Sequence, residues 1–165
     1  RGHFRILHFF RFLLLVKIGY PTEHEEFEVL SRTTGVTIAD VKPVIAAREI
    51  QQAQALVRQV NINPDLVSYV SRLIRATRPD TTAVAYVKEW VRWGAGPRAG
   101  QALILTAKAR ALLKGRYAVL PEDIHVMAPA VLRHRILLNF KAEAEQITAD
   151  DVTRELIKII ERPKG

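Results

Sequence analysis

The 165-residue sequence predicts a mainly α-helical fold that is preceded by one β-strand. Helix-capping patterns recur from Thr22 onward, and apolar residues make up 48% of the chain, which is enough for a hydrophobic core. Only residues 12–18 form a near-continuous apolar run, as in a strand covered on both faces of a parallel sheet. Because no comparable strand follows, we expect this strand to be the edge of a sheet whose other strands lie outside this sequence.

Local signals predict the first helices. Thr22 and Glu25 have the spacing of a capping box, which predicts a helix over 22–32. A proline interrupts residues 37–44, so we interpret them mainly as a linker. Residues 46–60 are rich in good helix formers and predict a second helix.

The later helices have clearer boundaries. Asn63 before Pro64 is an N-cap with a proline at the first helical position. Pro97 starts a helix that Gly115 can end, and Thr148 caps the last helix. The predicted helical ranges are 64–78, 82–93, 97–114, 121–133 and 148–161, with a short extended piece at 136–140.

Helical spacing also selects the residues that should face the core. After Asn63 these are Leu66, Val67, Val70, Leu73, Ile74 and Thr77. After Pro97 they are Ala99, Ala102, Leu103, Thr106 and Leu113.

The net charge of +8 suggests an anionic partner at first, but its distribution weakens that interpretation. Four basic residues precede residue 20 with no acid among them, and the rest of the chain holds 21 basic and 17 acidic residues. We therefore do not expect nucleic acid to be the main partner. The longest unbroken apolar run, 12–16, is far below the ~20 residues that span a membrane, so we expect no membrane span and no signal peptide. The absence of cysteine favours a cytoplasmic setting.

The sequence lacks the motifs of several classes of enzyme site. There is no phosphate-binding G-x-x-x-x-G-K-[ST] loop, no dinucleotide fingerprint and no zinc-binding pair of histidines, so no metal site is predicted. The carboxylate pairs fall in the first turns of predicted helices, where they complement the helix dipole. We assign these pairs, Glu122 with Asp123 and Asp150 with Asp151, a structural role.

Gly94-Ala95-Gly96-Pro97-Arg98-Ala99 is the strongest candidate for a functional site. Two glycines would let the backbone turn sharply, and Arg98 falls in the first turn of the helix that Pro97 starts. A helix N-terminus attracts anions, and an arginine there adds a charged fork that suits phosphate oxygens. From composition alone, a plain loop-to-helix junction with a solvated arginine is the better explanation of the pattern.

The segment 94–99 resembles the G-A-S-P-R-A sensor-2 motif of MoxR-type AAA+ ATPases, with glycine in place of serine. Further blocks resemble the same family in the same order across about residues 11–160. These blocks are Arg11-Phe12-Leu13, Gly19-Tyr20-Pro21, Ala76-Thr77-Arg78-Pro79, the alanine-rich helix 107–116, Val119-Leu120-Pro121-Glu122-Asp123-Ile124 and Val131-Leu132-Arg133-His134-Arg135-Ile136.

The resemblance implies an AAA+ lid at 20–165, preceded at 1–19 by the edge of an ATPase core. It implies that Arg98, after Pro97, reaches the γ-phosphate of ATP bound by its own subunit. Tyr20 and Pro21 would lie at the hinge between core and lid, near the adenine. Arg11 would be a finger that acts on a neighbouring subunit's nucleotide, although Phe10 stands where the family has aspartate.

For the intact protein, the resemblance implies ATP with magnesium, a homo-oligomeric ring, and partner proteins that include von Willebrand A domains. Because the Walker motifs are absent here, we expect no tight nucleotide binding and no hydrolysis by this chain alone. Two alternatives stay open. One is the lid of a magnesium-chelatase-type subunit, and the other is a stand-alone basic helical module that binds nucleic acid or protein.

Overall fold

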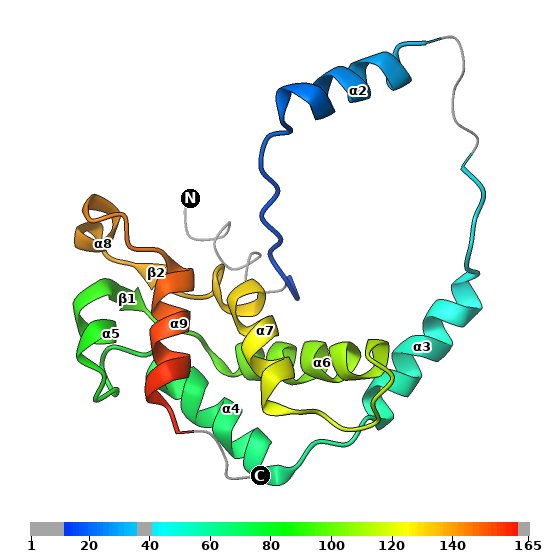
Figure 1. Cartoon of the computed structure of the whole chain (residues 1–165). Coiled ribbons are helices and arrows are strands. Elements are labelled where there is room, and N and C mark those ends of the chain that lie inside the picture. Colours follow the sequence, from blue (N-terminus) through cyan, green and yellow to red (C-terminus); the bar gives the residue numbers. More distant parts are fainter. Residues whose placement is uncertain (1–11, 36–40, 162–165) are drawn as a thin grey trace, which may run out of the picture.

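The computed structural model describes residues 12–35 and 41–161 (Figure 1). In these ranges the chain forms helices and one two-stranded antiparallel sheet, which confirms the predicted mainly α fold. The elements that carry the core are α4 (Pro64–Ala76), α6 (Pro97–Leu113), α7 (Pro121–Leu132) and α9 (Ala149–Ile159).

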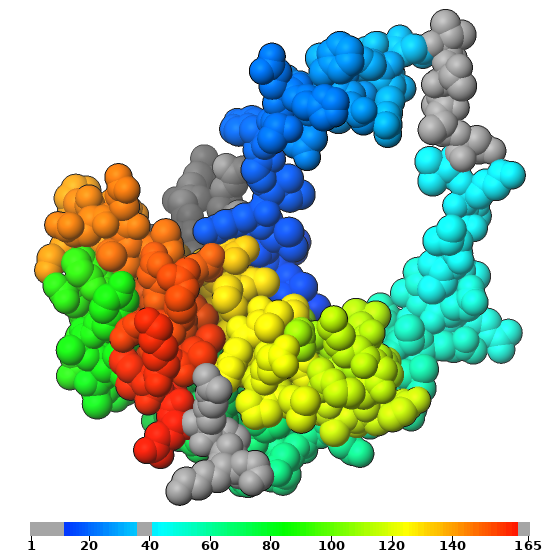
Figure 2. Space-filling view, in the orientation of Figure 1, coloured from blue at the N-terminus to red at the C-terminus, as the bar shows by residue number. Residues whose placement is uncertain are grey.

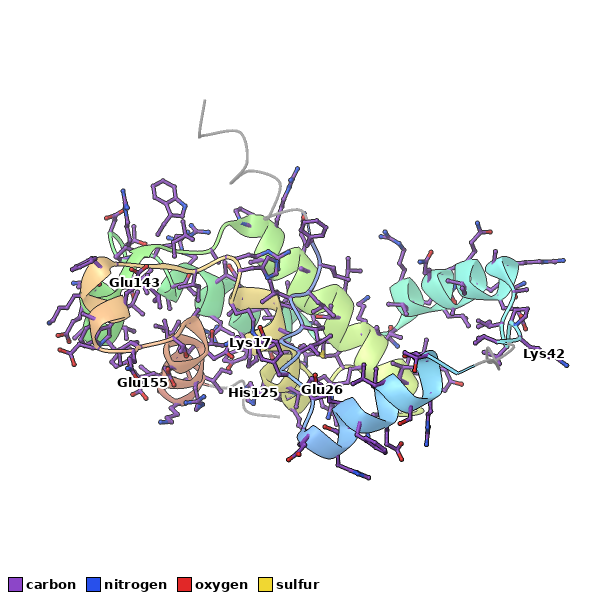
Figure 3. All side chains as sticks on the ribbon, turned by 90° about the horizontal axis from the view of Figure 1, so that it is seen from above. Lys17, Glu26, Lys42, His125, Glu143 and Glu155 are labelled. Atoms are coloured by element: carbon purple, nitrogen blue, oxygen red, sulfur yellow. The ribbon has the colours of Figure 1, made fainter. Side chains whose placement is uncertain are left out.

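Two helices stand apart from this bundle. Figures 1 and 2 show α2 (Glu23–Thr33) and most of α3 (Ala47–Gln59) away from the other helices, and neither helix has a buried residue. Figure 3 places Lys42, which precedes α3, far from the bundle. The predicted capping box of α2 is confirmed, because the Glu25 carboxylate accepts the Thr22 N–H at 2.8 Å. Local capping alone therefore accounts for the start of this helix.

The core of the bundle lies where α6 packs against α4 and α7, and where α7 packs against α9. Its largest fully buried side chains are Tyr69, Leu73, Leu103, Ile124, Leu132 and Leu156. The prediction that Val67 and Leu113 face the core is wrong. Val67 is 40% exposed at the edge of the α4 stripe, and Leu113 is 87% exposed in the last turn of α6. Leu113 instead lines an open apolar groove between α3, α6 and α7.

The predicted helix over 82–93 is shorter than expected. Helix α5 (Ala85–Trp90) ends at Trp90, and the next residues form β1 (Val91–Trp93). Strand β1 pairs with β2 (Leu137–Leu138), and the short helix α8 (Phe140–Ala144) follows β2. Val91 and Trp93 are residue types that suit a pleated surface, and β2 supplies the backbone partners that decide the conformation. Of the predicted extended piece at 136–140, only Leu137–Leu138 form β2, and Phe140 already begins α8.

The prediction of a strand over 12–18 is wrong. Residues 12–20 contain no strand in the structure. A strand needs the hydrogen bonds of a neighbouring strand, and here the end of α7 supplies the partners instead. The Leu15 N–H donates to the Ala130 carbonyl at 2.9 Å. The segment is extended but lies against a helix.

Two features join the end of α6 to the start of α7. Gly115 has a φ of 71°, and the N–H groups of Gly115 and Arg116 donate to Leu112 and Ala111, as in a Schellman motif. Beyond this turn, the predicted first-turn position of Asp123 is confirmed, but its carboxylate is also fully buried.

The Asp123 carboxylate is the centre of an ion-pair cluster. It accepts hydrogen bonds from Arg116 at 2.6 and 2.8 Å, from the Leu120 N–H at 2.9 Å, and from Arg110. Burial alone raises the pKa of Asp123, but these hydrogen bonds outweigh burial and lower its pKa to about 2. Asp123 therefore does more than complement a helix dipole, since it holds α6 to α7.

Candidate functional site

The loop Gly94–Gly96, between β1 and α6, is anchored to the C-terminal end of α4. The Ala95 N–H donates to the Thr77 hydroxyl at 2.8 Å, and that hydroxyl donates to the Ile74 carbonyl at 2.6 Å. Arg78 Nε donates to the Ala95 carbonyl at 3.1 Å. Because Thr77 and Ala95 are buried, these bonds set the position of the first turn of α6 relative to α4.

The two glycines of this loop have different roles, and neither has the positive φ that a sharp glycine turn would require. A Cβ at Gly94 would lie 2.4 Å from the Thr77 carbonyl oxygen and 2.7 Å from Arg78 Cα, so the close backbone approach requires glycine. Gly96 is extended, and a Cβ there would meet nothing within 4 Å. The structure thus explains Gly94 but leaves Gly96 open to other residues.

We expect Gly96→Ser to stabilise the protein slightly. Gly96 is the N-cap of α6 and makes no side-chain cap hydrogen bond, which a serine hydroxyl would supply. The gain expected from such a cap is a few tenths, about 0.3 kcal/mol, in the free energy of unfolding. Urea denaturation followed by circular dichroism measures it, and a loss of stability would contradict the open geometry at this position.

Arg98 lies at an exposed position in the first turn of α6, directly after Pro97. The two residues line a cavity of about 700 Å³, named here the Arg98 cavity. Its described lining residues are Trp93, Gly94, Gly96, Pro97, Arg98, Ala99, Gln101 and Arg135. Within this set there are two arginines and no carboxylate.

The electrostatics of the Arg98 cavity favour an anion. The first turn of α6 holds no acidic residue, so the partial positive charge of the helix N-terminus is not compensated there. Arg98 has no hydrogen-bond or ion-pair partner among the described residues, and its guanidinium can engage a ligand without breaking a protein contact.

The second arginine of the cavity is held differently. Arg135 is only 3% exposed, and it donates to the carbonyls of Phe12, Leu13 and Val131. Burial lowers the pKa of Arg135 from its usual high value, and no carboxylate contacts it within the described residues. The pairing of β1 with β2 brings the residues just before β2 next to Trp93 and Gly94.

The structure brings together only some of the predicted site residues. Pro97 and Arg98 share the cavity, but Tyr20 and Pro21 are exposed on the segment that leads to α2 and do not line it. Arg11 lies outside the described residues. Sequence reasoning missed Arg135 as a lining residue, and its only signal was membership of the block that ends at Ile136.

In the described ranges, no three His, Asp or Glu side chains are grouped closely enough to hold a metal ion. None of the helices there is both long enough and apolar enough to cross a bilayer.

Comparison with known proteins identifies the type of domain. Residues 84–156 match the AAA lid domain family. The helical bundle and this match define the chain as one that carries the lid of an AAA-class protein. Chaperone MoxR1 of Mycobacterium tuberculosis is 35% identical over 155 residues, which cover 93% of this chain and 41% of MoxR1. The chain therefore carries an AAA lid domain and is similar over 93% of its length to a protein named as a MoxR chaperone.

Two further relatives agree with this assignment. Protein MoxR of Paracoccus denitrificans is 32% identical over 141 residues, covering 78% of this chain and 42% of that protein. A solved structure of a proposed ATPase from Cytophaga hutchinsonii superposes with a TM-score of 0.86 at 28% identity, over 96% of this chain and 49% of that one. The chain thus spans less than half the length of these relatives.

Proposed function

We propose that Arg98 is a sensor-2 arginine, which contacts the γ-phosphate of ATP bound by its own subunit and so couples the lid to nucleotide state. The observation that carries this proposal is the setting of the Arg98 guanidinium. It has no hydrogen-bond or ion-pair partner among the residues that the structure describes, and no acidic residue lies in the first turn of its helix. The described lining of its cavity contains no carboxylate. The match to the AAA lid family and the MoxR relatives supports the choice of ATP as the anion.

The anchoring of the loop supplies the mechanical part of the proposal. Arg98 has a planar fork that suits phosphate oxygens, and it has that partner before hydrolysis and loses it afterwards. Ala95 is hydrogen-bonded to Thr77 and Arg78 at the end of α4. A movement of the first turn of α6 towards or away from the phosphate should therefore also move the end of α4. The lid is therefore expected to move as one body when the γ-phosphate leaves.

The remaining functional assignments concern the full-length protein. ATP with Mg²⁺ would be bound jointly with an ATPase core, in a cytoplasmic homo-oligomeric ring that remodels or assembles partner proteins, as the chaperone name of MoxR1 suggests. Tyr20 and Pro21 would lie at the hinge, and Arg11 would act on the neighbouring subunit. The present sequence holds no G-x-x-x-x-G-K-[ST] loop, so we expect hydrolysis only from the full-length protein.

The test is Arg98→Ala in the full-length protein that carries this chain. The loss of one charged hydrogen-bonding group should lower kcat/KM for ATP hydrolysis by about 10- to 100-fold. Arg98→Lys keeps the charge without the fork and should give an intermediate value.

The matched control is Arg92→Ala. Arg92 is exposed on the neighbouring strand β1 and does not line the Arg98 cavity, so hydrolysis should not change. Unaltered hydrolysis together with unaltered nucleotide affinity in Arg98→Ala would reject the sensor role.

A further inference from the structure

Three consecutive basic residues follow α7, and all three bind the extended segment 12–15. Together they satisfy the backbone carbonyls that a neighbouring strand would otherwise pair with. The contacts are Arg133 to the Leu15 carbonyl at 2.9 Å, His134 Nε2 to the Phe12 carbonyl at 3.0 Å, Arg135 to the Leu13 carbonyl at 3.2 Å, and Arg135 to the Phe12 carbonyl. The segment is thus bound at both of its ends to the residues that end and follow α7.

Arg135 differs from Arg133 in its surroundings. Arg133 also forms a two-point ion pair with Asp150 of α9, at 3.1 and 3.0 Å, and Lys17 contacts the same carboxylate at 3.5 Å. Arg135 has no such carboxylate and is buried, and it lines the Arg98 cavity. Of the three residues 133–135, Arg135 is therefore the one that both binds the segment 12–15 and lines the Arg98 cavity.

We propose that Arg135 is a positioning residue that couples the Arg98 cavity to the segment 12–15 and, through it, to the chain leading into α2. The proposal rests on the sensor role of Arg98. It adds a route by which nucleotide state reaches residues outside the lid bundle.

The physical argument depends on the cost of separating these groups. The Arg135 guanidinium is buried, and its charge is balanced by carbonyl dipoles alone, one from the last turn of α7 and two from the segment. Pulling the segment away would break the hydrogen bonds to Phe12 and Leu13 and leave the guanidinium with one protein acceptor, the Val131 carbonyl, which is unfavourable. The segment, the end of α7 and one wall of the cavity therefore move together. Figure 1 shows the same segment continuing upward from α7 into α2.

Hydrogen–deuterium exchange in the full-length protein tests this coupling. The probe is the exchange of residues 12–18, where the Leu15 N–H is bonded to Ala130, with and without a non-hydrolysable ATP analogue. In the natural sequence we expect exchange here to change when the analogue binds. In Arg135→Gln that nucleotide-dependent change should disappear even when the analogue is present at a concentration that saturates the variant.

Two further variants keep the result interpretable. Arg133→Gln loosens the same segment without touching the cavity, so exchange should rise in both states and the nucleotide-dependent difference should remain. If Arg135→Gln behaves in the same way, Arg135 is merely structural and the proposal is overturned. If Arg135→Gln does not fold, Arg135→Lys retains the charge but not the fork, and it should reduce the difference by at least about threefold. An undiminished difference in Arg135→Lys overturns the proposal.

Arg98→Ala separates this inference from the sensor role on which it rests. If Arg98→Ala keeps the nucleotide-dependent change, the sensor role fails. If Arg98→Ala loses the change but both Arg135 variants keep it, the sensor role stands and the coupling through Arg135 fails.

Discussion

Replacing Asp123 with alanine is expected to lower the free energy of unfolding by about 3 kcal/mol. The substitution removes the carboxylate that Arg110 and Arg116 share, and it leaves two partly buried guanidinium groups without that partner. Breaking a fully buried ion pair typically costs about 3–5 kcal/mol. Urea denaturation monitored by circular dichroism measures the loss. The control is Glu122→Ala, because Glu122 is 70% exposed and its pair with Arg110 should contribute less than about 0.5 kcal/mol.

The same residue predicts how stability depends on pH. The pKa of Asp123 falls from its usual 3.8 to about 2 in the folded protein, so its contribution is present above the unfolded pKa and is lost as pH falls through the folded pKa. Between pH 5 and pH 2 this carboxyl should account for a loss of roughly 2 kcal/mol. Asp123→Asn should show a correspondingly shallower acid dependence, and an identical pH profile would contradict the assignment.

Replacing Gly94 with alanine should destabilise the protein by about 2–3 kcal/mol, since the new Cβ would lie 2.4 Å from the Thr77 carbonyl and the backbone must shift. The shift would also disturb the bonds that position Arg98, so activity of the full-length protein should fall as well. Thermal and urea unfolding give the first quantity, and ATP hydrolysis gives the second.

Gly96→Ser is the matched control for this substitution, because it adds a larger side chain two residues away in open space. If Gly94→Ala proves as stable as Gly96→Ser, the close approach to Thr77 does not constrain this loop.

The helices that sequence reasoning located best are those with local capping signals. Thr22, Asn63 and Thr148 each accept the backbone hydrogen bond that their position predicts, and Gly115 ends α6 with a positive φ. Capping involves residues within one turn of each other, so the necessary information is contiguous in the sequence.

Two of the errors involve a partner far away in the chain, and a third comes from the position of a residue at the end of its helix. Residues 91–93 leave the helix because β2 pairs with them. Residues 12–18 do not form a strand, and the backbone of Leu15 is hydrogen-bonded to the end of α7 instead of to a neighbouring strand. Leu113 has helical spacing for the core, yet it lies at the end of α6, where it lines an open groove. Periodicity within one element could not reveal these contacts.

The candidate site divides in the same way. The sequence by itself determined that an arginine follows a proline at the first turn of a helix, because cap residues and proline act locally. Only the tertiary structure decided that this arginine faces a cavity without a described carboxylate, and that Gly94 must be small because α4 passes against it. It also decided that Arg135, 37 positions further along the chain, forms a wall of the same cavity. The residues that surround Arg98 come from β1, the loop 94–96, α6 and the position before β2. Packing brings these segments together, and no local pattern in the chain encodes it.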